Sequence, residues 1–420
     1  VRAAWALHLM SVWGIRTEEG GIRKLEAEAK REIAELTPIL VEAGLLDLRK
    51  GTRKLKAALD RMKKIKPEGR RTETGRMALD EEACDESGDP VLIAVSRYGR
   101  AQNILVKDVR AMLEGVQWPI HAHFDSLVDT GRTSCSGPNL QNPRRKEGVR
   151  ECFVPRPGHL YAACDFDKAE LHTLAQVCFT ILGHSRLAER LNAGFDPHLD
   201  LGAQILGISY EEAIRRKGDP LVKEARQHAK PANFGFPGGM GVAGFLSYAK
   251  ATYGLSFDPD QARVLKERWF ENWPEMREYF RWVSNLVGAS DAGSIKHLDS
   301  KRQRGLVSYT VAANSFFQGL AADGAKAALF EVCRKQYNDP KSVLYGCRTV
   351  NFIHDELLVE VPEATAHEAA IELQRTMIEA FNPWVPDVPV RASVTLMRRW
   401  SKNAEPVWME GRLAPWDPRP

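Results

Sequence analysis

The spacing of hydrophobic residues divides the first part of the chain into a helical segment and a turn-rich stretch. Over residues 1–66, hydrophobic residues recur every three to four positions among many Ala, Leu, Glu, Lys and Arg, which predicts amphipathic helices. Residues 67–90 are polar and contain glycine, so we expect a loop and a short helix there. Residues 129–148 are rich in Gly, Ser, Pro and Asn, which indicates turns.

Strand patterns begin after these turns. The sequence "HLYAACDF" (159–166) is a short apolar run that predicts a strand, and helical spacing follows it at once in "KAELHTLAQVCFTIL". Residues 190–300 are mostly helical in pattern and include the aromatic-rich "RWFENWPEMREYFRWV". Residues 309–335 predict a further long and mostly apolar helix.

The last part of the chain predicts a hairpin, a helix and a closing strand. In "VNFIHDELLVEVP" (350–362), two apolar runs meet at His354 and Asp355, which predicts two strands joined by a tight turn. A helix over about 364–381 and a strand near "VPVRASVTL" follow. Because strands and helices mix without regular alternation, we expect an α+β fold.

The composition is typical of a soluble globular protein. With 420 residues, of which 44% are hydrophobic and 27% charged, the chain is long enough for two or three domains. It has no apolar run of membrane-spanning length and no signal-peptide pattern, so we expect a cytoplasmic protein (host cytosol, if viral) without a membrane partner. Seven cysteines without a C-x-x-C pair favour reduced thiols over a zinc site. Because the chain begins with Val1, one interpretation is a fragment or processed product that lacks an upstream domain.

Positive charge is concentrated in one segment. The net charge of the whole chain is only +4, but residues 49–76 contain twelve Lys or Arg and three Asp or Glu, a local net charge of +9. A segment of this kind can neutralise phosphates of a nucleic acid. A solvated helix face is the alternative, and charge alone favours that alternative.

The sequence "RQHAKPANFGFPGG" (226–239) carries a column of cations. Asp219 and Pro220 are typical of a helix start, and helical spacing then aligns four side chains on one face: Lys223, Arg226, Lys230 and Phe234. Three cations followed by an aromatic ring suit a nucleoside triphosphate. The alternative is a solvated cationic face with Phe234 in the core, and because cationic helix faces are common, the column alone does not outweigh this alternative.

Acidic residues stand at the ends of predicted strands. Asp165 ends the strand 159–166, while Asp167 and Glu170 have the spacing of a helix capping box. Asp355 and Glu356 lie at the tip of an apolar hairpin, where carboxylates are costly without a cation or solvent. Asp165 and Asp355 could together hold two divalent cations, as phosphoryl transfer requires. For Asp355 alone, an ordinary polar turn is the simpler interpretation.

Taken together, these segments resemble a known family. "DFDKAEL", "RQHAKPANFG" and "IHDEL", in this order, are similar to motifs A, B and C of the family A DNA polymerases. "TGRTSCSGPNLQNP" (130–143) is similar to the primer-template motif of that family, and "NSFFQGLAAD" (314–323) resembles a later helix. Five ordered motifs span essentially the whole chain, whereas any one of them would be weak evidence.

The resemblance implies a right-hand polymerase fold, with a palm built on an antiparallel sheet and with helical fingers and thumb. Residues 1–115 would form the thumb, 190–300 the fingers, and 116–189 with 301–420 the palm. The basic segment 49–76 would then grip the minor-groove side of the product duplex. The resemblance thus reverses the preference for a solvated face.

The resemblance also implies roles at the reaction centre. Asp165 and Asp355 would hold two Mg²⁺ ions (or Mn²⁺ in their place), the carbonyl of Phe166 would assist, and Glu356 would have an auxiliary catalytic role. Glu170 would crowd a ribose 2′-OH. The dNTP triphosphate and sugar would be bound by His198, Arg226, Lys230 and Phe234, and Lys230 would also protonate the leaving pyrophosphate. Primer and template would be held by Arg132, Asn139, Gln141, Asn142, Asn314, Gln318 and His354.

Three positions depart from the family pattern. Gln227 stands where a second arginine is expected, and Gly238 where a tyrosine is expected near the template base. Pro231 follows Lys230 directly, which predicts a kink in the helix. These departures concern fidelity and template handling.

The resemblance implies a template-directed DNA polymerase that extends a primer 3′-OH with dNTPs, as a monomer or with replication accessory proteins. No run of exonuclease acids is present, so we expect no proofreading, and "GDPVL" (88–92) and "FGFPGG" are more similar to phage members than to bacterial repair enzymes. A reverse transcriptase stays open as an alternative. Glu170 disfavours a single-subunit RNA polymerase, and the presence of Asp165 and Asp355 disfavours a catalytically silent DNA-binding replication factor.

Overall fold

A computed structural model describes residues 2–48, 52–69, 72, 76–126, 128–142, 148–288 and 293–417. The basic segment 49–76 is therefore described only in part, because residues 49–51, 70, 71 and 73–75 lie outside the described residues, as does Pro143 of the expected primer-template motif.

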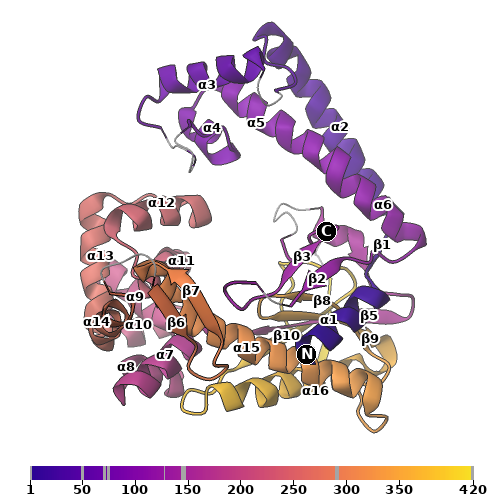
Figure 1. Ribbon diagram of the computed structural model, residues 1–420. Helices are drawn as coiled ribbons and strands as arrows, with labels where there is room; N and C mark the ends of the chain where they lie inside the picture. Colours follow the sequence, from indigo (N-terminus) through magenta and orange to yellow (C-terminus); the bar gives the residue numbers. More distant parts are fainter. Residues whose placement is uncertain are drawn as a thin grey trace.

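A six-stranded sheet lies in the lower half of the molecule (Figure 1). The strand order is β11 (Val407–Met409), β12 (Arg412–Trp416), β10 (Ala392–Met397), β5 (His159–Phe166), β9 (Glu356–Pro362) and β8 (Arg348–Ile353). The β10–β12 pair is parallel, unlike the antiparallel sheet expected, and the other pairs of this sheet are antiparallel. Helices and strands occur in irregular order, as the α+β expectation requires.

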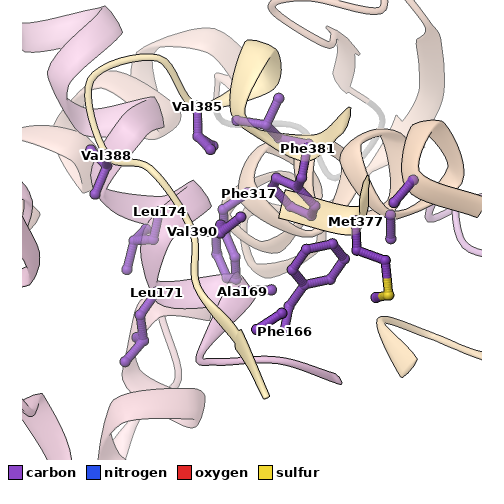
Figure 2. Close-up of a cluster of buried hydrophobic side chains, with 14 of the residues drawn as sticks. Phe166, Ala169, Leu171, Leu174, Phe317, Met377, Phe381, Val385, Val388 and Val390 are labelled. Carbon is purple, nitrogen blue, oxygen red and sulfur yellow. The ribbon is translucent and has the colours of Figure 1, made fainter. Parts of the chain in front are cut away.

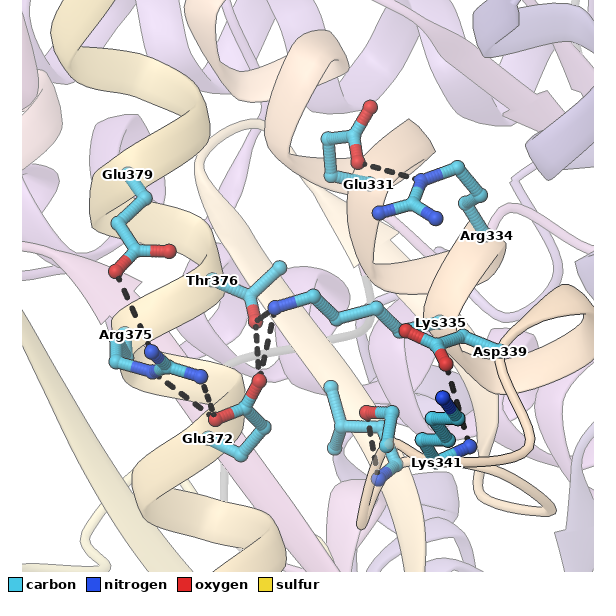
Figure 3. Close-up of polar contacts among 11 residues, drawn as sticks. Glu331, Arg334, Lys335, Asp339, Lys341, Glu372, Arg375, Thr376 and Glu379 are labelled. Atoms are coloured by element: carbon cyan, nitrogen blue, oxygen red, sulfur yellow. Dashed lines mark hydrogen bonds and ion pairs between the residues drawn. The ribbon is translucent and has the colours of Figure 1, made fainter.

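Two long helices, α15 (Tyr309–Asn338) and α16 (Ala366–Phe381), lie against each other below the sheet (Figure 1), and α1 (Arg2–Trp13) packs on α15. Figure 3 shows their polar contact, in which Lys335 Nζ of α15 donates to Glu372 Oε1 at 2.8 Å and to Thr376 Oγ1 at 2.9 Å on α16. The buried face of α16 recurs at Ala366, Ala369, Ala370, Leu373 and Met377, the spacing of an amphipathic helix.

A compact core fixes the end of β5 (Figure 2). Phe166, the last residue of β5, is 3% exposed, and its ring centroid lies 4.6 Å from that of Phe381. Side chains from the following helix, from α15, from α16 and from residues 385–390 complete the cluster: Ala169, Leu171, Leu174, Phe317, Met377, Val385, Val388 and Val390. Each large buried side chain of this kind contributes about 1.5–3 kcal/mol of burial free energy, so the position of Asp165 next to Phe166 is firmly set.

A first helical part extends away from the sheet (Figure 1). Its long helices α2 (Glu19–Glu42) and α5 (Pro90–Asn103) pack along each other, and π-helical η1 (Ile104–Val109) and α6 (Arg110–Gln117) continue α5. At its far end lie α3 (Arg53–Ile65) and α4 (Glu81–Ser87), on a separate small core that includes Leu40, Met62, Cys84 and Leu92.

A second helical part lies beside the sheet (Figure 1). It contains α7 (Ala169–Leu182), α8 (Arg186–Asn192), α9 (Pro197–Leu206), α10 (Tyr210–Arg215), α11 (Pro220–Gly235), 3-10 helix η3 (Phe236–Gly238), α12 (Val242–Tyr253), α13 (Pro259–Asn272) and α14 (Glu275–Val287). Three of these helices begin with Asp-Pro, where the Asp side chain accepts backbone N–H groups and Pro occupies the first turn: Asp196, Asp219 and Asp258.

Short strands pair outside the main sheet. These pairs are β1 (Arg16–Thr17) with β4 (Phe153–Val154), β2 (His123–Asp125) with β3 (Ser134–Ser136), and β6 (Gly293–Lys296) with β7 (Gln303–Val307). Short 3-10 turns are η2 (Arg150–Cys152), η4 (Glu363–Thr365) and η5 (Asn382–Trp384). The β6–β7 hairpin interrupts the segment expected to be mostly helical, and β11–β12 follow the strand expected to close the chain. The predicted strand 159–166 and hairpin 350–362 are confirmed.

Candidate active site

The predicted acidic residues meet at the ends of neighbouring strands. Asp165 on β5 pairs in register with Glu356 on β9, and Asp355 precedes Glu356 in the tight turn between β8 and β9. Asp165 is accessible to solvent, whereas Asp355 and Glu356 are half-buried. The two strands therefore bring carboxylates together that are almost 200 positions apart in the sequence.

Burial and mutual repulsion disfavour the ionised forms of these carboxyl groups and raise their pKa values. Burial, followed by the charges of Asp355 and Glu356, raises the pKa of Asp165 well above its usual range. Burial, followed by the charge of Glu170, raises the pKa of Asp355, and burial raises that of Glu356. A nearby cation would remove the repulsion and favour the ionised carboxylates.

The turn at Asp355 has an uncommon backbone. His354 has φ 60°, in the left-handed region that residues other than glycine seldom adopt, and Asp355 N donates to Ile353 O at 2.7 Å. Such conformations occur where the surrounding structure holds them, often at functional sites. The His354 side chain reaches solvent at the tip, but the surrounding protein removes part of its hydration, and this desolvation, followed by the charge of Arg132, lowers its pKa.

The acidic cluster fits a site for Mg²⁺ that is shared with a substrate. In the described part of the chain, no three His, Cys, Asp or Glu side chains form a complete metal-binding group. Mg²⁺ is commonly held by only one or two carboxylates together with substrate phosphates and water. Two clustered carboxylates with raised pKa values, at the end of a strand beside the carbonyl of Phe166, match that kind of site.

Glu170 does not form the capping box expected from Asp167. The helix α7 begins at Ala169 after Lys168, whose φ is 56°, and no side chain caps it. Asp167 Oδ1 instead accepts from Ser393 Oγ at 2.9 Å, and the Glu170 carboxylate forms an ion pair with Arg132. The capping-box interpretation is therefore wrong, because the left-handed residue Lys168 turns the chain before the first helical turn.

Helix α11 carries the cationic column. Arg226 Nε donates to Asp196 Oδ2 at 2.9 Å, and Asp196 is its single hydrogen-bond or ion-pair partner within the described residues. Burial, followed by the charge of Arg226, lowers the pKa of the half-buried Lys230. The helix continues through the buried Pro231 to Gly235, so Pro231 does not end it.

Phe234 lies beside His198 and outside the core. Phe234 is half-buried, and the two ring centroids are 5.1 Å apart, while the neighbouring Phe236 is 1% exposed. Burial lowers the pKa of His198 to about 3, so this ring is neutral at pH 7. An amide hydrogen of Asn233 points to His198 Nδ1 at 3.2 Å, which places the ring proton on Nε2. His198 is only 2% exposed, so its ring packs against Phe234 and has almost no contact with solvent.

In the loop expected to contact primer and template, the side-chain amides of Asn139 and Gln141 form hydrogen bonds within the protein. Gln141 is 4% exposed, and its Nε2 donates to Thr133 Oγ1 at 2.6 Å and to Phe352 O at 2.8 Å. Asn139 Oδ1 accepts from the backbone N–H groups of Gln141 and Asn142. These contacts fasten the loop to β8 next to the acidic turn and leave the Asn142 side chain on the surface.

Three residues near the acids were missed by the sequence interpretation. The charge of Lys402 opposes part of the rise in the pKa values of Asp165 and Glu356, and the charge of Arg150 opposes part of the rise for Glu356. The Arg150 guanidinium lies 4.7 Å from the centre of the Trp400 ring, and Trp400 shares a hydrogen bond with Glu356. The run of Arg, Trp and Lys at 398–402, after the predicted closing strand, could have signalled Trp400 and Lys402, whereas no sequence pattern signals Arg150.

Comparison with known proteins assigns the family. A family model described as DNA polymerase family A matches residues 21–402. The matched range holds the acidic cluster, the cationic helix α11 and α15. The chain therefore belongs to DNA polymerase family A.

The chain is similar to bacterial DNA polymerases I. It is 28% identical over 349 residues to DNA polymerase I of Aquifex aeolicus, covering 81% of this chain and 56% of that protein. It is 26% identical over 405 residues to DNA polymerase I of Lactococcus lactis subsp. lactis, covering 91% and 43%. The chain thus spans about half the length of these curated relatives.

A solved structure confirms the architecture. The POL domain of Pol1 from M. smegmatis, in complex with DNA primer-template and dNTP, superposes with a TM-score of 0.76 at 25% identity, covering 95% of this chain and 69% of that one. This similarity confirms the right-hand polymerase fold. No helix among the described residues has the length and apolar character needed to span a membrane.

Proposed function

We propose that this chain is a template-directed DNA polymerase that adds dNTPs to a primer 3′-OH, without proofreading. The observation that supports the proposal is the proximity of Asp165, at the end of β5, to Asp355, in the adjoining β8–β9 turn, in a chain that belongs to DNA polymerase family A. In this proposal residues 1–115 are the thumb, 190–300 the fingers, and 116–189 with 301–420 the palm.

Asp165 and Asp355, with the Phe166 carbonyl, would hold two Mg²⁺ ions, which when bound stabilise the charges on the attacking and leaving oxygens. Both carboxylates must be ionised to bind Mg²⁺. Because their pKa values are raised, a bound cation would stabilise the ionised form. Glu356 hydrogen-bonds with Trp400 and lies near the cations of Arg150 and Lys402. Its role is to position the turn.

The cationic face of α11 would bind the triphosphate. The ion pair with Asp196 fixes Arg226, and its terminal guanidinium nitrogens suit phosphate oxygens. The lowered pKa of Lys230 makes its ammonium a stronger acid than an ordinary lysine, which suits proton donation to leaving pyrophosphate. Phe234, supported by the neutral His198, would pack against the sugar and base.

The Arg132–Glu170 ion pair would form the sugar-side wall of this site. Arg132 fixes the Glu170 carboxylate near Asp355, where it would crowd a ribose 2′-OH. DNA contacts would come from Arg132, Asn142, Asn314, Gln318 and His354, while Asn139 and Gln141 shape the loop that presents them.

Primer extension tests the proposal. The purified chain should extend a labelled primer on a DNA template with dNTPs and Mg²⁺, and it should stop when EDTA is added. With a mismatched primer end and no dNTPs, the primer should stay intact, because we expect no proofreading. Absence of extension under all Mg²⁺ and Mn²⁺ concentrations would refute the polymerase assignment, and shortening of the mismatched primer would refute the absence of proofreading.

A further inference from the structure

The loop that follows α11 lacks side chains at two successive positions, and α15 fills their places. A Cβ atom on Gly238 would lie 2.6 Å from Asn314 Oδ1, and one on Gly239 would lie 2.6 Å from Tyr309 Cε1. Both distances are shorter than ordinary contacts between non-bonded atoms. Any larger residue at either position would therefore have to displace Asn314 or Tyr309.

The side chain of Asn314 is held in this place by its own helix. Its Nδ2 donates to Thr310 O at 2.9 Å, and Gln318 Nε2 donates to its Oδ1 at 3.4 Å. The amides of Asn314 and Gln318 thus follow one another along one face of α15, and the first of them lies against Gly238.

Tyr309 is the first residue of α15 and is half-buried. Its ring lies against Gly239, whose φ of 73° suits glycine, and its centroid is 6.3 Å from that of Phe280 on α14. Burial raises the pKa of Tyr309, so its hydroxyl is neutral at pH 7. One part of the side chain packs on protein, and the rest is accessible to solvent.

Gly238 and Gly239, called the glycine corner below, follow α11 and lie against α15. These are the two helices that the proposed function assigns to substrates. Phe234 and Lys230 lie on α11, one and two turns before the corner, and Asn314 and Gln318 lie on α15, which leads away from it. Under the proposed function, the incoming nucleotide would lie against Lys230 and Phe234 of α11, and its template partner against Asn314 and Gln318 of α15. The side chains at the corner would then border the templating base.

We propose that Tyr309 and Asn314 form the template-side wall of the nascent base pair and so determine base selection, in place of a side chain at position 238. This inference rests on the proposed polymerase function. Tyr309 offers a flat ring for stacking, which every base accepts, and Asn314 offers an amide whose position depends on the space at Gly238.

Tyr309 is tested by single-nucleotide insertion on one template. We would measure kcat/KM for the correct and for an incorrect dNTP with the wild type, Tyr309→Ala and Tyr309→Phe. Tyr309→Ala should lower the ratio of correct to incorrect insertion by about five- to a hundredfold, since it removes one aromatic stacking interaction. Tyr309→Phe keeps the ring and should stay within about twofold of the wild type. An unchanged ratio in Tyr309→Ala would overturn the inference.

Gly238 supplies a second and independent test. The methyl group of Gly238→Ala should displace the Asn314 amide and lower the selection ratio, but it should have no further effect in an Asn314→Ala background. Gly241→Ala is the matched control, because a Cβ on Gly241 meets no atom within 4 Å. Additive effects of Gly238→Ala and Asn314→Ala would contradict the assigned contact.

The two proposals fail in distinguishable ways. If the wild type extends a primer but Tyr309→Ala selects bases as the wild type does, only the present inference fails. If the wild type gives no extension at all, the proposed function fails and this inference with it. Thermal unfolding of each variant identifies a loss that arises from folding, because such a loss lowers Tm and affects correct and incorrect insertion alike.

Discussion

At the scale of single residues, the ion pair between Arg132 and Glu170 links two segments of the expected site. Arg132 comes from the loop before β3, and Glu170 from the first turn of α7. The pair is partly exposed, so its contribution to stability is small, about 0–1 kcal/mol. Its importance lies in the position that it gives to the Glu170 carboxylate, near Asp355.

Glu170→Ala should raise the incorporation of ribonucleotides relative to deoxyribonucleotides, by about tenfold or more, because it removes the group that crowds the 2′-OH. Glu170→Gln is the matched control, since it keeps the size of the side chain and removes the charge. Competition between rNTP and dNTP on one primer measures the ratio. If Gln and Ala variants change the ratio equally, charge and not size excludes the ribose.

Phe234→Tyr should make the enzyme accept dideoxynucleotides more readily, because a tyrosine hydroxyl can supply a polar contact that the missing 3′-OH no longer makes. One such contact is worth on the order of 1–3 kcal/mol, so termination should rise about tenfold to a hundredfold. Termination frequency in a mixture of ddNTP and dNTP gives the answer. Equal termination by the two proteins would mean that Phe234 does not contact the sugar.

How far the site could be predicted differs from residue to residue. That Asp165 and Asp355 lie close together could be predicted only from the resemblance of their two segments to one family, because an ordinary polar turn was the simpler interpretation of Asp355 alone. The pairing of Glu170 with Arg132 could not, since a left-handed Lys168 decides where α7 begins and the sequence spacing favoured a cap. Gln141 was expected to face DNA, yet it is buried against β8, and helical or strand periodicity gives no information about such loops.

At the scale of elements, α3 is the basic helix of the first helical part. Its exposed cations include Arg53, Lys56, Lys63 and Lys64, whereas Arg61 is held by Asp89 through two hydrogen bonds of 2.9 and 2.7 Å. Ala58 and Met62 face the small core, so the cations gather on the opposite side. This arrangement leaves four charges ready for an external polyanion.

Neutralising Arg53, Lys56, Lys63 and Lys64 together should weaken primer-template binding with little dependence on sequence. The slope of log K against log salt should flatten by up to about 0.9 for each phosphate that is no longer neutralised. A control that neutralises Arg334, Arg375, Arg398 and Arg412, each paired with a carboxylate, should leave the slope unchanged. If both variants bind as the wild type does, α3 is a solvated face.

Elements with strong patterns were predictable, and short polar ones were not. Strand β5 and the β8–β9 hairpin were expected at nearly their observed bounds, because their residues are continuous apolar runs. The β6–β7 hairpin has charged strands of four and five residues with a register shift, and β11 and β12 are similarly short. Such strands are stabilised by tertiary contacts, which the local pattern of hydrophobic residues does not predict.

At the scale of the whole molecule, the two helical parts approach each other above the sheet, at α4 and α12 (Figure 1). Lys250 Nζ on α12 lies 2.8 Å from Glu86 Oε1 on α4. Under the proposed function, this ion pair joins the thumb to the fingers around the DNA. Both side chains are partly exposed, so we expect the contact to open and close readily.

A covalent link at this contact should trap DNA. Glu86→Cys with Lys250→Cys should be joined by a short bis-maleimide, while the seven native cysteines are buried and should react slowly. Linked after binding, the enzyme should retain a primed circular template at high salt, because the ring around the DNA is closed. The Glu86→Cys variant alone is the control. Equal release by linked and unlinked enzyme would show that DNA does not pass between α4 and α12.

The central claim is that Asp165 and Asp355 form the reaction centre, and single-turnover extension of a bound primer with Mg²⁺ tests it most directly. Asp165→Ala and Asp355→Ala should each lower the rate by more than about a hundredfold, while primer-template affinity is retained in at least one of them. Asp167→Ala is the matched control, because Asp167 lies two positions away and contacts Ser393, and it should extend at nearly the wild-type rate. Normal extension by either the Asp165 or the Asp355 variant would contradict the account.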